Sequence, residues 1–214
     1  MSATPTPTRR SEVLKASPKM FESDFLDFFT RVHPAVPVVL FGPAIVLLAL
    51  LGIDGAGAWA PAWIAGGYLF WTLTEYWLHR VVFHFEPDHP LGRRFHFIIH
   101  GVHHDHPNDR LRLVMPPSAS IPLAALFLLA FWAVLGPGAW QAFGAGFLAG
   151  YLAYDMLHFH VHHHKPKTRL GRKLRELHMR HHFQDGDRGF GVSAPWWDHV
   201  FGTAPRVRRR SKAS

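Results

Sequence analysis

Three long stretches of this 214-residue chain contain no charged side chain, and they limit the folds open to it. Residues 34–53 and 55–74 are uncharged and are separated by Asp54, and residues 113–154 form a third such stretch. A helix needs about 20 mostly apolar residues to cross a bilayer. Gly136-Pro137-Gly138 is a strong turn signal that divides the third stretch into two. We therefore predict an all-α integral membrane protein with four transmembrane helices in two hairpins, at about 34–53, 55–74, 115–135 and 138–157.

The positions of the basic residues support this topology. All 23 Lys and Arg residues lie before residue 34, within 75–112 or after residue 154. The positive-inside rule then places both termini and both connecting segments in the cytoplasm, where they would form a helical cap. This distribution explains the formal net charge of +8 without a nucleic-acid partner. A soluble helical core would not predict such one-sided placement.

The ends of the chain have a different composition from the spans. Residues 1–20 are rich in Pro, Thr, Ser and basic side chains, which predicts a disordered tail. Residues 21–29 combine aromatic and acidic side chains, which predicts a short amphipathic helix at the membrane interface or packed on the protein's own core. We place the main domain at 21–204 and a basic tail at 205–214.

The chain contains 18 histidines and no cysteine, so thiolate metal sites and disulfides are excluded. Four histidine groups begin where a predicted span meets the cytoplasm. His79 and His84 are five residues apart, which puts them about 140° apart on an ideal helix. They reach one ion only if the helix ends or bends between them; otherwise each serves a different ion. The other three groups have helical i, i+3 or i+4 spacing: His96, His100, His103 and His104; His158 and His162; His178, His181 and His182.

Four such groups within 104 residues indicate a metal site. Imidazole suits zinc, copper, iron and nickel. Eight or more imidazoles exceed what one ion can take, so we infer two ions. The remaining histidines have no comparable geometry, and we expect them at the interface or in solvent; they are His33, His89, His106, His160, His163, His164 and His199.

The order and spacing of several motifs over residues 68–204 resemble the fatty acid 2-hydroxylases, within the membrane fatty acid hydroxylase/sterol desaturase superfamily. The histidine motifs point to the superfamily, and the Arg-Leu-Val-Met-Pro-Pro and Tyr-Asp-x-x-His stretches point to the 2-hydroxylase branch. The motifs are Glu75-Tyr-x-x-His-Arg-x-x-Phe-His84, Phe95-His-Phe-x-x-His-Gly-x-His-His104, Asp109-Arg-Leu-Arg-Leu-Val-Met-Pro-Pro117, Tyr154-Asp-x-x-His-x-x-x-His162, His178-x-x-His-His-Phe183, Gly189-Phe-Gly-Val-Ser193 and Trp197-Asp-x-x-Phe-Gly-Thr203.

The resemblance implies a dinuclear centre that inserts one oxygen atom from O2 beside the carboxyl carbon of a long acyl chain, free or within ceramide or another sphingolipid. Breaking that C–H bond needs a redox metal, so iron is expected in the active protein, although zinc could fill the same ligands after purification. His96 also matches a family histidine, but we predict that it lies beside the ligands and is not one of the ten. The ten ligands that the resemblance implies are His79, His84, His100, His103, His104, His158, His162, His178, His181 and His182.

Carboxylates often hold the ring N–H of a ligating histidine. Glu75, Asp155 and Asp198 are candidates for this role, and Asp155 is favoured because it lies three residues before His158. A surface ion pair or a helix cap is the plain alternative for each carboxylate.

Electrons for the reaction are expected from a separate protein, such as cytochrome b5 or a ferredoxin with its reductase, because too few residues precede the first span for a haem domain. The basic cytoplasmic face suits an acidic donor or the headgroups of anionic membrane lipids. The composition favours the cytoplasmic membrane of a bacterium over the endoplasmic reticulum.

Two other functions compete with 2-hydroxylation. The first is another lipid oxygenase of the same superfamily, namely a sterol desaturase, a carotenoid hydroxylase or an alkyl-lipid monooxygenase. The second is a non-enzymatic metal-binding or metal-transporting membrane protein. A transporter places ionisable ligands near the bilayer midplane, whereas the stretches 34–53 and 113–154 contain no histidine.

Overall fold

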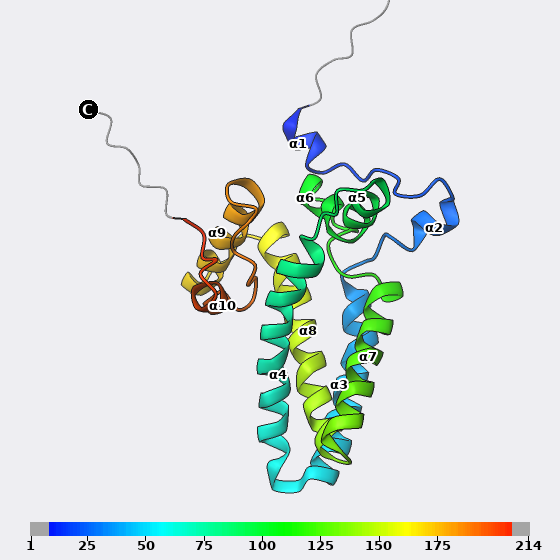
Figure 1. The fold of residues 1–214 in the computed structure, drawn as a ribbon, viewed down its shortest axis with the longest axis vertical. Helices are drawn as coiled ribbons and strands as arrows, with labels where there is room; N and C mark the ends of the chain where they lie inside the picture. The colour runs from blue at the N-terminus through cyan, green and yellow to red at the C-terminus, as the bar shows by residue number, and fades with distance from the viewer. Residues whose placement is uncertain (1–8, 207–214) are drawn as a thin grey trace, which may run out of the picture.

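The structure is a computed structural model that describes residues 9–206. Those residues form an all-helical protein in which four long helices make an elongated bundle and the shorter helices gather beyond one end of it (Figure 1). The elements, which include two π-helical turns (η2 and η3), are α1 (Arg10–Val13), α2 (Asp24–Phe28), α3 (Ala35–Ala56), η1 (Gly57–Trp59), α4 (Ala60–Trp77), η2 (Leu78–Phe83), α5 (Pro90–His96), η3 (Phe97–Gly101), α6 (Val102–Asp105), α7 (Pro117–Leu135), α8 (Ala139–His163), α9 (Arg169–Phe183) and α10 (Trp196–Val200).

The long helices begin and end close to the predicted spans, with two differences. Helix α3 continues past Asp54 to Ala56, and the chain turns at Gly57, whose φ of 54° is in the region that favours glycine. Helix α8 continues to His163, past the predicted end at residue 157. This extension lifts His158 and His162 beyond the bundle into the region of the shorter helices.

Helix α8 packs closely against both α4 and α3. Small residues permit the short distance between these helices. A Cβ atom added at Gly67 of α4 would lie 1.9 Å from the carbonyl oxygen of Phe143, and one added at Gly146 of α8 would lie 1.9 Å from that of Ile64. The backbones of α4 and α8 are therefore in contact, with no room for side chains at these two positions.

The surface of the bundle is apolar. Two helical stretches, Ala35–Phe83 and Pro117–Leu135, are long and apolar enough to cross a membrane by length and composition, and the turn at η1 divides the first stretch into α3 and α4. Outward-facing side chains such as Val39 and Val134 are 73% and 80% exposed. Apolar surface of this extent is typical of helices that face lipid.

The predicted disorder of residues 1–20 is wrong for residues 9–20, and residues 1–8 lie outside the described part of the chain. The Leu14 carbonyl accepts a hydrogen bond from the Asn108 N–H, and Arg31 donates to Ser17 Oγ at 2.7 Å. The buried Asp27 carboxylate accepts from the backbone N–H of Met20 at 2.7 Å. Hydrogen bonds to partners distant in sequence thus order a segment whose own composition predicts disorder.

Helix α2 is a single five-residue turn within the predicted amphipathic segment. Its carboxylate Asp27 points inward and pairs with Arg31 and Arg112. Phe25 and Phe28 are 71% and 70% exposed. The aromatic side of this turn therefore faces away from the protein instead of packing on its core.

Candidate metal centre

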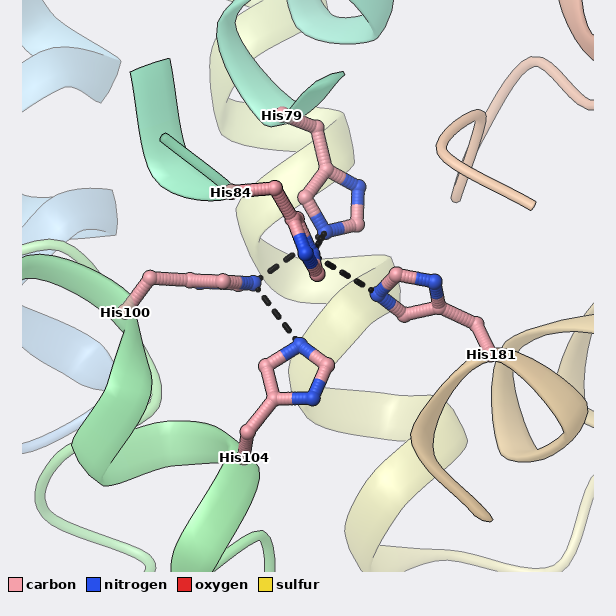
Figure 2. Close-up of side chains that lie close together, drawn as sticks. All are labelled: His79, His84, His100, His104 and His181. Carbon is pink, nitrogen blue, oxygen red and sulfur yellow. Dashed lines mark hydrogen bonds between the residues drawn. The ribbon is translucent and has the colours of Figure 1, made fainter. Parts of the chain in front are cut away.

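Ten buried or half-buried histidines meet at the end of the bundle and form two groups of five. In each group the five candidate ligand nitrogens all lie within 4.8 Å of one another. Figure 2 shows the first group, whose rings come from η2, η3, α6 and α9 and turn their Nε2 atoms toward a common point. The first group is His79, His84, His100, His104 and His181; the second group is His103, His158, His162, His178 and His182.

A π-helical turn explains how His79 and His84 join the same group. The backbone N–H of His84 donates to the carbonyl of His79 at 3.2 Å, which is the i→i+5 bond of a π-helix. The wider turn brings residues five apart onto one side of the helix. Of the two alternatives left open by the spacing, the structure therefore has the first in a different form: a wider turn instead of a bend brings the two nitrogens to 3.3 Å from each other.

Two helical segments, the continuous segment η3–α6 and helix α9, each contribute histidines to both groups. The sequence did not indicate this division. His100 and His104 are one turn apart and belong to the first group, whereas His103 belongs to the second. In α9, His178 and His182 belong to the second group and His181 to the first. Pairs at i,i+4 stay together, and the residue between them faces the other group. The two groups consequently lie side by side between these helices.

The first group fits a cation because of its ring tautomers. His79 Nδ1–H donates to the Phe190 carbonyl at 2.7 Å, and His181 Nδ1–H donates to the Arg188 carbonyl at 2.8 Å. A carbonyl only accepts, so each of these Nε2 atoms has a lone pair and no proton. His84 Nε2 lies within 3.3 Å of both His79 Nε2 and His181 Nε2, yet it has at most one proton to donate. A metal ion would relieve the facing lone pairs.

The spacing and burial of the nitrogens also fit metal ions. Two nitrogens bound at right angles about 2.1 Å from one ion would lie about 3.0 Å apart. The Nε2–Nε2 contacts of the first group span 3.0–3.3 Å. In the second group, His162 and His182 Nε2 lie 2.8 and 3.1 Å from His178 Nε2. His103 and His158 each have a buried Nε2 without a hydrogen-bond partner in the described chain.

Burial keeps these rings neutral, as metal ligands must be. Desolvation, with smaller repulsion from His181 and other rings, lowers the pKa of His103 to about 3 and that of His104 to about 2. Burial and the neighbouring rings lower the pKa of His178 in the same way. The groups therefore offer lone pairs instead of positive charge over the physiological pH range.

These shifts predict that the metal-free protein loses stability in mild acid. An unfolded histidine has a pKa of about 6.5, so below that pH the unfolded chain binds protons that the folded groups do not accept. We expect the melting temperature of the metal-free protein in detergent, followed by circular dichroism, to fall steeply between pH 7 and pH 5. It should stay nearly constant from pH 7.5 to 8.5, where the rings are neutral in both states. A constant melting temperature down to pH 5 would contradict the buried, neutral assignment.

At His79 and His181, backbone carbonyls take the role that was predicted for carboxylates. Asp155 accepts hydrogen bonds from the Met115 N–H and the Tyr151 hydroxyl, and Glu75 accepts from the Ser193 N–H at 2.7 Å and from its hydroxyl. Asp198 accepts from the N–H groups of Phe190 and Gly191, both at 2.9 Å. Within residues 9–206 these carboxylates form no hydrogen bond to a histidine ring. Asp198 instead stabilises the loop whose carbonyls accept hydrogen bonds from His79 and His181.

The other histidines lie outside both groups. His96 is half-buried at the end of α5, and its ring is 3.4 Å from the position of a Cβ added at Gly101. His160 and His164 are exposed and stack on one another. His106, which was expected at the interface or in solvent, forms a 2.6 Å hydrogen bond from its Nδ1–H to the Val13 carbonyl and helps to order the N-terminal segment.

A small apolar pocket with a cavity volume of about 10 Å³ lies between α4, α7 and α8. Trp71, Phe127, Leu148 and Tyr151 are among its lining residues. Tyr151 is two helical turns before His158, so the pocket lies on the bundle side of the second group. Its lining residues include Ser120 and Tyr151, which have hydroxyl groups, and Trp71, which has an indole N–H.

The described chain thus combines two apolar helical stretches long enough to cross a membrane with two groups of five histidines that could each hold a metal ion. Residues 64–203 match the fatty acid hydroxylase family, and the chain belongs to that family.

Two curated relatives are similar to this chain in sequence, and one solved structure is similar to it in fold as well. A dihydroceramide fatty acyl 2-hydroxylase of Arabidopsis thaliana is 37% identical over 92% of this chain and 84% of its own length. A ceramide very long chain fatty acid hydroxylase of Saccharomyces cerevisiae is 45% identical over 64% of this chain and 36% of its own. A solved structure of scs7p, in which only the hydroxylase domain is visible, superposes with a TM-score of 0.80 at 36% identity, over 88% of this chain and 73% of that one.

Proposed function

We propose that this protein is an O2-dependent monooxygenase that hydroxylates the 2-position of long-chain fatty acyl groups, either free or within ceramide. The observation that supports this most is the pair of five-histidine groups beside an apolar pocket, in a chain 37% identical to a dihydroceramide fatty acyl 2-hydroxylase. Such homology makes the chain an oxidoreductase of the fatty acid hydroxylase family.

The ten histidines of the two groups are the proposed ligands of two ions. Attack on an unactivated C–H bond requires a redox metal, so the active form is proposed to be di-iron, with zinc able to fill the same nitrogens. Bound iron would supply the activation of O2. One oxygen atom enters the C–H bond, and the other leaves as water with two electrons and two protons from a donor.

The protein's own residues position the acyl chain and exclude water. The pocket between α4, α7 and α8 offers an apolar surface to the chain, with aromatic rings of Trp71, Phe127 and Tyr151 along it. A chain that enters there from the lipid would have its carboxyl end toward the histidines. Burial of the rings, including His178 at 2% exposure and His181 at 0%, keeps bulk water from the reacting carbon.

The proposed topology has four spans, α3, α4, α7 and α8, with the histidines at the cytoplasmic side, as the distribution of Lys and Arg favours. Exposed basic residues at the start of α9, such as Arg169, Arg172 and Lys173, would face the same compartment. They suit an acidic electron donor such as a cytochrome b5 or a ferredoxin, and equally the anionic headgroups of the membrane.

Lipid profiling by mass spectrometry tests the function. The chain would be expressed in cells together with a cytochrome b5 or ferredoxin donor, beside the His104→Ala variant as a metal-site control. New 2-hydroxy acyl chains should appear with the unaltered protein alone, and the lipid that contains them identifies free acid or ceramide as the product. If iron is bound and no such chains form, the proposal fails, and hydroxylated or desaturated sterols, carotenoids or alkyl lipids would identify the other superfamily activities.

A further inference from the structure

The two histidine groups differ in how the outer nitrogens of their rings are held. In the first group, His79 and His181 each donate an Nδ1–H to a backbone carbonyl, at 2.7 and 2.8 Å. In the second group, the Nδ1 atoms of His178 and His182 are buried without a hydrogen-bond partner in the described chain. No hydrogen bond joins Nδ1 of His103, His158 or His162 to the protein within residues 9–206.

The carbonyls that hold the first group belong to one loop, and Asp198 fixes that loop. The Asp198 carboxylate is 1% exposed and accepts from the N–H groups of Phe190 and Gly191 at 2.9 Å and from Thr203 Oγ1 at 2.8 Å. These bonds set the direction of the Phe190 carbonyl. Arg188 Nη1 donates to the carbonyls of Gly202 and Ala204 at 3.1 Å, which holds the residue whose own carbonyl contacts His181.

We propose that the two metal sites are inequivalent: the first group binds its ion more tightly and fills first, and Asp198 is the positioning residue that makes it so. The inference depends on the proposed metal centre. A hydrogen bond to the outer nitrogen fixes the tautomer and the ring plane and raises the basicity of the ligating nitrogen. Loss of such a partner typically weakens metal affinity by about 10–100-fold. The first group has two such bonds from its rings, and the second has none within the described chain.

The two groups also differ in burial, and this difference affects how fast a metal ion enters and leaves each of them. His84 and His104 of the first group are half-buried, whereas only His182 of the second group is. The first site therefore has the shorter path to solvent, which affects how fast an ion enters and leaves. The order of filling has to be measured at equilibrium, where burial-limited exchange does not contribute.

The experiment is a zinc binding isotherm of the whole protein in detergent micelles. Metal-free protein would be dialysed to equilibrium against chelator-buffered Zn²⁺, and bound zinc would be counted by mass spectrometry. We expect two steps of one ion each, separated by at least about tenfold in Kd. His178→Ala, which breaks the second group, should keep the tight step, and His181→Ala, which breaks the first, should keep only the weak one.

Asp198→Asn tests the positioning role, because the amide keeps the size of the side chain but places N–H against the loop's N–H groups. The tight Kd should rise about tenfold while the weak Kd stays unchanged. A role confined to general folding would shift both steps together. Glu176→Gln is the matched control, since this exposed carboxylate of α9 forms ion pairs with Lys173 and Arg180 at the protein surface; it should move neither step.

The outcomes separate this inference from the proposed function. Two equal steps overturn the inequivalence alone. Loss of the tight step in His178→Ala, with the tight step retained in His181→Ala, also overturns it. A shift of the weak step, or of both steps, in Asp198→Asn overturns the role of Asp198. An unaltered protein that binds no zinc overturns the metal centre itself and, with it, both proposals.

Discussion

Replacing His181 with alanine is expected to abolish 2-hydroxylation and to remove close to one of two bound ions per chain. His181 is fully buried, its Nε2 lies 3.1 Å from that of His84, and a carbonyl fixes its tautomer. Alanine removes a ligand and leaves a cavity that no neighbouring ring can fill. The proposed di-iron chemistry would need both ions, so loss of one should reduce turnover by several orders of magnitude.

The measurement pairs iron content with 2-hydroxy acyl product in the same membrane preparation. His160→Ala is the matched control, since His160 is an exposed histidine of the same cap that lies outside both groups. It should retain product and both ions. Full activity with two ions in His181→Ala would mean that the ligand set is wrong.

Replacing Gly146 with valine is expected to separate α4 from α8 and to unfold the bundle or leave it without metal. A Cβ at this position would lie 1.9 Å from a backbone oxygen of Ile64, so no rotamer of the new side chain relieves the clash. Overpacking of a close interface costs about 1–3 kcal/mol where side chains can adjust. With backbone on the other side, we expect a loss of stability at or above the upper end of that range.

The melting temperature and the folded fraction in detergent measure this effect. Gly42→Val is the control, because a Cβ atom added there, in another long helix, meets nothing within 4 Å. Equal stability of the two variants would show that α4 and α8 do not pack in this way. Because α8 also holds His158 and His162, bound metal should fall together with stability in Gly146→Val.

The sequence predicted the positions of the helices along the chain better than it predicted which helices pack against one another. Uncharged stretches and turn residues locate the long helices, because each depends only on local composition. The helical spacing of His158 and His162, and of His178 and His182, predicts that each pair shares a face, and both pairs do belong to one group. The close contact of α4 and α8 at Gly67 and Gly146 was not predicted, since it depends on which helices become neighbours.

The division of the histidines between two groups could not be read from spacing. His100, His103 and His104 lie on one helical stripe, and only the placement of α8 and α9 beside it decides which ring joins which group. The carbonyl partner of His79 is Phe190, which is 111 residues away in sequence. Because every residue has a backbone carbonyl, the sequence does not indicate which carbonyl will contact a histidine. Carboxylates can be located in the sequence, and they were therefore predicted instead. The order of residues 9–20 was missed for a similar reason, since it depends on distant polar partners.

The wide turn between His79 and His84 accommodates one residue more than an ordinary α-helical turn between two rings that face the same way. Four residues, 80–83, separate these rings, whereas three separate the i,i+4 pair His100 and His104 of the same group. Deleting one of the four would restore α-helical spacing and would leave both rings on one side of the helix. We therefore expect the first group to tolerate a one-residue deletion in this turn better than a one-residue insertion, which neither kind of turn accommodates.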